Sequence, residues 1–91
     1  MSNIKFIYFD SENIDSSSLI QRLNQLCVST FRVKHDIVLV NYNGVSQSLY
    51  SNLGEFIQSK NILIMEVNPS TGAYWGYMDK SLWEWLSSNN N

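Results

Sequence analysis

The sequence has little cysteine, little histidine and no excess of basic residues, and each shortage excludes a class of protein. A single cysteine, Cys27, excludes an internal disulfide and any cysteine-rich zinc site. A single histidine, His35, excludes a metal cluster or proton relay built on several histidines of one chain. The formal net charge is −2, so the basic field that non-specific nucleic-acid binding needs is lacking. These counts disfavour an autonomous DNA-binding monomer.

Length and hydropathy set further bounds. The 91 residues, 44% of them apolar, suffice for one domain over residues 1–91 with a single core. No basic segment precedes an apolar region near the amino terminus, and no apolar run approaches the length of a membrane span. We therefore expect a cytoplasmic protein without membrane contact. Glycine-rich phosphate loops, nucleophile elbows and zinc-finger spacings are also missing from the sequence.

The stretch from Ile4 to Phe9 predicts the strand around which the chain is organised. It is an almost continuous apolar and aromatic run, followed by Asp10 and the turn residues 11–13. Such a run between turn formers is typical of a central strand that is buried on both faces. Asp10 then lies where this strand leaves the sheet, at the carboxyl edge where open α/β folds tend to place their ligands.

Two changes of period follow. Several N-cap candidates over residues 14–18 precede apolar residues at three- and four-residue spacing, which predicts an amphipathic helix of about three turns with Cys27 on its apolar face. From Val28 the pattern alternates, which predicts a half-exposed edge strand, a tight turn near His35 and Asp36, and a buried strand over 37–40. The link is too short for a parallel crossover, so we expect an antiparallel pair.

The second half adds a helix, a strand and a short last helix. An apolar stripe predicts a second helix, and the run from Ile62 to Val67 predicts a third buried strand, which Pro69 and Gly72 end. Asp79 is placed to cap a short last helix, after which residues 89–91 fray. The stripe of the second helix consists of Val45, Leu49, Leu53, Phe56 and Ile57, and the aromatic residues of the tail are Tyr74, Trp75, Tyr77, Trp83 and Trp85.

The order strand, helix, strand, strand, helix, strand, short helix predicts an α+β fold. With right-handed crossovers it gives the ferredoxin-like sandwich, in which a four-stranded antiparallel sheet carries two helices on one face and the first and third strands are central. Neither central strand alternates cleanly, so we expect the opposite face also to be apolar, presenting Ile7 and Phe9 or their neighbours. A patch of that size usually marks an interface. The aromatic tail is expected to cover part of it and a second copy of the chain the rest.

Several of these stretches together resemble a known group of proteins. They are the Ile4-to-Asp10 strand, the hairpin through His35 and Asp36, the strand from Asn61 to Val67, and the closing residues 75–77 and 81–86. They look like the small SinR-annotated proteins of bacteria and phages, which are similar in fold to the ferredoxin-like CRISPR-associated spacer-integration subunit and to virulence-associated protein D. The resemblance covers nearly the whole chain, and it rests on apolar and aromatic patterns without a catalytic signature.

The resemblance gives a functional counterpart to one residue, Asp10. In the nuclease-like relatives an acidic residue at the end of the first strand faces its symmetry mate across a dimer, where the pair can hold a divalent cation. Two carboxylates bind Mg²⁺ through oxygen ligands, and the metal can polarise a phosphate or activate water. Glu12 and Asp15 are close enough in sequence to add carboxylates, although acidic residues also favour a helix amino terminus. A strand-end Asp is equally a common turn residue, and this chain has no basic groove.

Several other residues have both a structural and a functional interpretation. Glu66 lies inside an apolar strand, where a charge needs a partner, and we expect it to pair with Lys5 or Arg32. The tryptophans are suited to stack nucleic-acid bases, or to pack in the core or an interface. The residues expected at an interface are Ile7, Phe9, Glu66, Tyr74, Trp75 and Tyr77.

Two functions remain open. The favoured one is a non-catalytic, homodimeric protein-interaction module without a cofactor, in bacterial defence, phage counter-defence or toxin neutralisation, whose acidic surface engages a basic partner. The chain would then work in the host cytoplasm if a phage encodes it. The alternative is a weak Mg²⁺-dependent endonuclease acting on RNA or DNA through Asp10, with Mg²⁺ as its cofactor.

Overall fold

The computed structural model describes residues 3–67 and 76–89. Over these residues the chain is α+β, with an open four-stranded antiparallel sheet and three helices. The strands are β1 (Ile4–Phe9), β2 (Ser29–Lys34), β3 (Ile37–Asn41) and β4 (Ile62–Glu66), and the helices are α1 (Ser16–Leu26), α2 (Ser46–Leu53) and α3 (Lys80–Asn89). The strand order is β2-β3-β1-β4, so β1 and β3 are central as predicted. This arrangement is compatible with a ferredoxin-like type of fold.

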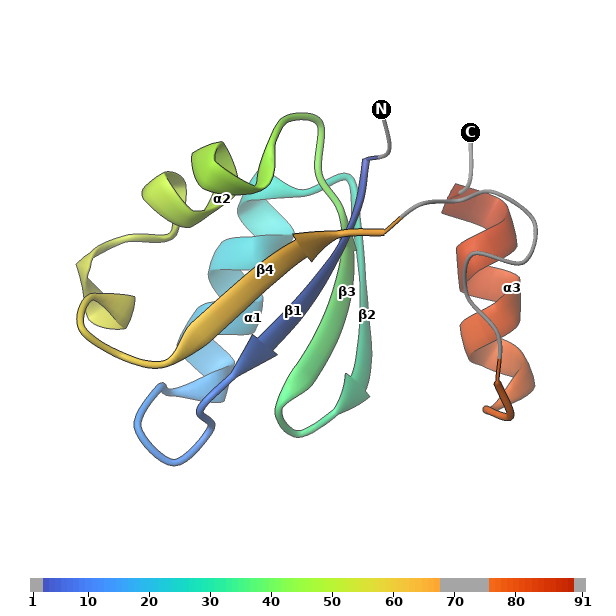
Figure 1. Cartoon of the computed structure of the whole chain (residues 1–91), viewed down its shortest axis with the longest axis horizontal. Coiled ribbons are helices and arrows are strands. Elements are labelled where there is room, and N and C mark those ends of the chain that lie inside the picture. Colours follow the sequence, from blue (N-terminus) through green and yellow to red (C-terminus); the bar gives the residue numbers. More distant parts are fainter. Residues whose placement is uncertain (1–2, 68–75, 90–91) are drawn as a thin grey trace.

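Helices cover both faces of the sheet. Figure 1 shows α1 and α2 on one side of the strands and α3 on the other. The larger core cluster lies between the sheet and the first two helices, where Leu19 and Leu23 of α1 meet Leu49 and Leu53 of α2. A second cluster lies on the opposite face, where α3 packs on the sheet. None of the helices among the described residues has the length and apolar character needed to cross a membrane.

Strand β1 shows which side chains face which layer. Ile7 and Phe9 are fully buried in the cluster beneath α1 and α2. Alternation places Phe6 and Tyr8 on the other face, and Phe6 packs in the second cluster. Ile7 and Phe9 are therefore core residues, and the face opposite the two helices presents their neighbours. Both faces of β1 are apolar, so the sequence alone did not distinguish the two alternating sets.

The first helix and the hairpin follow the predicted pattern. Helix α1 has 11 residues, which is three turns, and its apolar stripe faces the sheet. Strand β2 is a half-exposed edge strand that pairs with β3, and the turn between them contains His35 and Asp36. The backbone N–H of Phe9 donates to the carbonyl of Asp36 at 3.0 Å, which fixes this turn beside the end of β1.

Two predicted elements differ from the structure. The second helix ends at Leu53, because Gly54 has a φ of 113°, and the chain continues as a short 3₁₀ helix, η1 (Glu55–Ile57). Strand β4 lies at the sheet edge, as the predicted order with the first and third strands central requires, but the side chains of Leu63 and Met65 are half exposed where a buried strand is predicted. The prediction of a buried strand was wrong because α3 leaves this part of the outer face uncovered.

Helix α3 anchors on the outer face of the sheet. Leu82 and Leu86 are buried against Ile4 and Leu39, and the indole Nε1–H of Trp85 donates to Ser29 Oγ at 2.8 Å. The rings of Phe31 and Trp85 lie 6.1 Å apart between centroids. Trp83 is half-buried against the same cluster, so both tryptophans of α3 contact the domain. Asp79 precedes the helix, and its carbonyl accepts the N–H of Leu82 at 3.1 Å.

Candidate functional site

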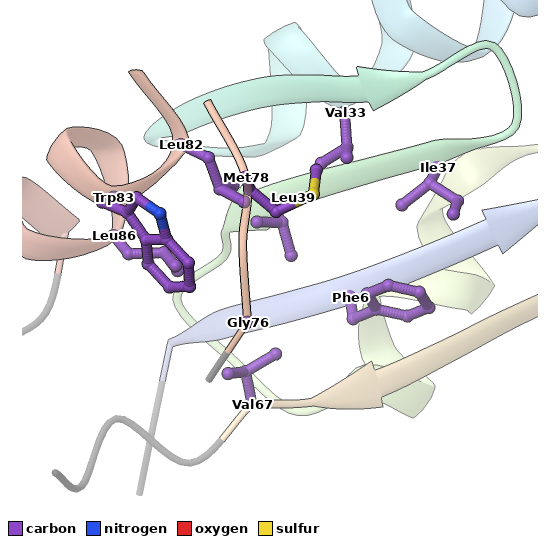
Figure 2. A pocket seen from close by; sticks show the side chains of 10 residues that line it. All are labelled: Phe6, Val33, Ile37, Leu39, Val67, Gly76, Met78, Leu82, Trp83 and Leu86. Atoms are coloured by element: carbon purple, nitrogen blue, oxygen red, sulfur yellow. The ribbon is translucent and has the colours of Figure 1, made fainter. Parts of the chain in front are cut away.

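The outer face of the sheet and α3 enclose an apolar groove of about 270 Å³. Figure 2 shows the side chains from the strands facing those from the segment before α3 and from α3 itself. The groove is lined by Phe6, Val33, Ile37, Leu39, Val67, Gly76, Met78, Leu82, Trp83 and Leu86. None of these side chains carries a carboxylate, an amine or a hydroxyl. The groove is therefore suited to bury apolar groups, and it offers no acid or base for catalysis.

An apolar strip continues the groove on the same face. It consists of Tyr8, Leu63 and Met65, whose side chains are 41%, 51% and 50% exposed. In the register of β1 and β4, Tyr8 lies opposite Leu63, and Phe6 of the groove lies opposite Met65. Directly opposite residues on neighbouring strands point to the same face of a sheet. The strip and the groove thus form one apolar surface that α3 covers only in part.

On the face of the sheet opposite the strip, Glu66 pairs with a buried lysine. Lys5 is fully buried in the central strand, and its Nζ lies 3.3 Å from Glu66 Oε1. Lys5 and Glu66 are directly opposite each other in the register of β1 and β4. The sequence predicts that Glu66 pairs with Lys5 or Arg32, and the pair with Lys5 is present. Removing the partner of a buried charge usually costs about 3–5 kcal/mol, and the half-exposed carboxylate lowers the expected cost here. Glu66 therefore stabilises the junction of β1 and β4.

Asp10 lies at the end of β1 as expected, and its carboxylate is engaged in the following turn. Oδ1 accepts the backbone N–H of Glu12 at 3.1 Å, and Oδ2 accepts the side-chain amide of Asn13 at 2.6 Å. The main-chain carbonyl of Asp10 also accepts the N–H of Ile14 at 2.9 Å. These bonds are those of an Asx-type turn that leads into α1.

The surroundings of Asp10 are polar but contain few carboxylates. A cavity of about 250 Å³ is lined by Asp10, Asn13, Ser59, Lys60 and Asn61. Among the described residues, no group of three or more His, Cys, Asp or Glu side chains is placed to hold a metal ion. Asp15 is directed elsewhere, because its Oδ2 accepts the hydroxyl of Ser18 at 2.6 Å. One chain thus brings a single carboxylate and an ammonium group to this cavity.

The remaining predicted site residues lie apart. Tyr74 and Trp75 are outside the described residues. Tyr77 is fully exposed, just before α3. His35 is also exposed in the hairpin turn, with Nε2 3.9 Å from Asp36 Oδ2. Cys27 is half-buried at the end of α1, and burial raises the pKa of its thiol to about 11, which disfavours the nucleophilic thiolate.

Sequence reasoning missed the residues that form the apolar strip. The sequence pattern predicts a buried strand for Leu63 and Met65 and a strand buried on both faces for Tyr8. Tyr8 indicates which face of β1 meets solvent. Its hydroxyl is the only polar group among the aromatic side chains of this strand, and tyrosine prefers a site where the ring is buried and the hydroxyl reaches water. Alternation from Tyr8 would have identified the partly exposed face.

Comparisons with known proteins add no relative. No protein-family model, no curated protein and no solved structure matches this chain.

Proposed function

We propose that this chain is a non-catalytic interaction module that forms a homodimer and binds a further protein through the outer face of its sheet. The observation that carries the proposal is the apolar strip of Tyr8, Leu63 and Met65, which is half exposed and runs into the apolar groove. Contiguous apolar surface of this kind on a small domain usually marks an interaction site. Closed dimers are the commonest assembly that would cover it.

The strip offers apolar side chains that a partner can bury. Burying one large apolar side chain contributes about 1.5–3 kcal/mol, so three half-exposed side chains in each of two protomers offer several kcal/mol before the cost of association is subtracted. The groove adds a concave apolar surface beside the strip. Interfaces concentrate their binding energy in such apolar and aromatic side chains inserted into pockets.

The net charge and the resemblance support a proposal for the further protein that the dimer binds. The net charge of −2 favours a basic partner, since complementary charge steers association. Similarity to the SinR-annotated proteins would place such a module in bacterial defence, phage counter-defence or toxin neutralisation, in the cytoplasm of the host. The endonuclease alternative gains no support from the geometry of Asp10, whose two carboxylate oxygens are both engaged within its own turn.

Sedimentation equilibrium at micromolar concentration tests the proposal. The parent is expected at twice 10.5 kDa. Leu63→Lys, which places a charge in the middle of the strip, is expected to sediment as a monomer. Val28→Lys is the matched control, because Val28 is an exposed apolar residue outside the strip and the groove, and it should leave the dimer intact. A parent that remains monomeric, or a Leu63→Lys dimer as tight as the parent, would contradict the proposal.

A further inference from the structure

The two edges of the sheet differ in how they are protected from pairing. The edge strand β2 carries Arg32 and Lys34, and its register with β3 is irregular between these two residues. Cations and bulges are the usual means of preventing an edge strand from pairing with another chain. The edge strand β4 has neither, because it runs Ile62, Leu63, Ile64, Met65 without a charge before Glu66 and its register with β1 is regular.

Within residues 3–67 and 76–89, the backbone of β4 has pairing positions on its outer side that no hydrogen bond fills. Asp10 N–H donates to the carbonyl of Asn61 at 2.9 Å, and Val67 N–H donates to the carbonyl of Ile4 at 2.8 Å. In an antiparallel ladder the bonding direction alternates, so Ile62, Ile64 and Glu66 direct their N–H and C=O groups away from β1. Figure 1 shows β4 as the strand nearest the viewer, with no described helix or strand in front of it.

We propose that β4 of a second copy pairs antiparallel with this edge, about a two-fold axis at Ile64, and joins the two sheets into one. The inference rests on the proposed homodimer and specifies its geometry. The copies meet at their β4 edges, so that Leu63 and Met65 are partly buried and the rest of the outer face stays available to the further protein. Ile64 of one copy lies opposite Ile64 of the other, and Ile62 lies opposite Glu66 of the other. Each of these outward residues then supplies one donor and one acceptor to the new ladder.

The side chains of β4 fit a second copy in this register. Leu63 of one copy lies opposite Met65 of the other on the outer face, so the two apolar strips become continuous across the axis. In the antiparallel arrangement, Glu66 at the end of one β4 lies toward Lys60, which precedes the first residue of the other β4. A parallel arrangement would bring like charges together, and like charges at short range destabilise a pair.

Selective disulfide formation tests the register. In a Cys27→Ser background, Leu63→Cys and Met65→Cys are prepared separately, oxidised alone and as a mixture, and compared by non-reducing electrophoresis. Directly opposite Cβ atoms lie about 4.5–5.5 Å apart, whereas diagonal positions lie about 7–8 Å apart, beyond the reach of an unstrained disulfide. The mixture is expected to give a several-fold stronger dimer band than either variant alone. Val28→Cys, mixed with either, is the control and should not crosslink.

Amide exchange separates edge pairing from other dimers. As the concentration rises through the dimerisation range, the N–H groups of Ile64 and Glu66 are expected to exchange at least about tenfold more slowly, because pairing occupies them. A dimer by sedimentation in which Ile64 exchanges at the monomer rate and no selective disulfide forms would overturn edge pairing and leave the homodimer in place. A monomer at every concentration would overturn both.

Discussion

At the scale of single residues, Asp10 acts as a turn former. Asp10→Ala removes the acceptors of the Glu12 N–H and the Asn13 amide and is expected to lower the free energy of unfolding by about 1–2 kcal/mol. Asp10→Asn keeps one acceptor oxygen and should cost less. Urea unfolding measures both. Mg²⁺ is expected to leave the Tm of the parent unchanged, and a Mg²⁺-dependent rise that disappears in Asp10→Asn, together with nucleic-acid cleavage by the parent alone, would establish the endonuclease instead.

Burial of the Cys27 thiol predicts that the unfolding free energy falls at high pH. Its thiol pKa rises from 9.0 in the unfolded chain to about 11 in the folded one, so folding favours the protonated form. The resulting stabilisation is complete below pH 9 and is lost as the pH rises through 11. The parent should therefore lose more unfolding free energy over this range than Cys27→Ser, in which the other titrating groups are unchanged. Equal losses in the two proteins would show that the thiol is not desolvated.

Residue-level prediction succeeded where one side chain needed a specific partner. Glu66 was expected to pair with Lys5 or Arg32 because a charge in an apolar strand is otherwise costly, and the pair with Lys5 is present. It failed for Ile7 and Phe9, which are core residues. A shift of one residue exchanges the two faces of a strand, and when both faces are apolar the sequence carries no mark of which set faces the helices.

At the scale of elements, Gly54 ends α2. Its φ of 113° and ψ of 179° lie in a region essentially restricted to glycine, so Gly54→Ala is expected to lower the unfolding free energy by about 1–3 kcal/mol. Gly76→Ala is the control, because a Cβ there would meet nothing within 4 Å and no left-handed φ is involved. Thermal unfolding of both variants gives the comparison. An equally small shift in Tm for the two would mean that Gly54 does not require its conformation.

Helix α3 is held to the sheet by apolar burial and a few polar bonds. Leu86→Ala is expected to cost about 2–5 kcal/mol, since the leucine is 5% exposed in the second cluster. Ser87→Ala, at the next and exposed position, should change stability by less than about 0.5 kcal/mol. Urea unfolding followed by tryptophan fluorescence reports on α3 directly. Equal stability of the parent and Leu86→Ala would mean that α3 is a loosely attached appendage.

Element existence was predictable and element limits were less so. The sequence predicts α1, the β2–β3 hairpin and the last helix, because the spacing of apolar residues changes at the ends of each. The second helix was extended through Phe56 and Ile57 because their spacing continues the apolar stripe, although the backbone changes at Gly54. The edge position of β4 follows from the predicted topology. The exposure of Leu63 and Met65 depends on how much of the outer face α3 covers, which no local pattern records.

At the scale of the whole molecule, the proposed dimer is apolar and its salt dependence should reflect this. Raising NaCl from about 0.05 M to about 0.5 M screens exposed charges but does not weaken apolar burial. The dissociation constant measured by sedimentation is therefore expected to stay within about threefold or to fall. A steep rise with salt would point to an interface made of charged groups. Under the same conditions binding to duplex DNA, if present, would weaken strongly.

The position of α3 has a consequence for the order in which the protein assembles. Its contacts are with Ile4, Phe31 and Leu39, which come from three different strands, so they exist only once the sheet has formed. During synthesis the strands also emerge first, at about 5–20 residues per second, and α3 follows after roughly a second. For that interval the whole outer face of a nascent sheet is bare. Chains made side by side on one messenger RNA then have an opportunity to meet before α3 docks.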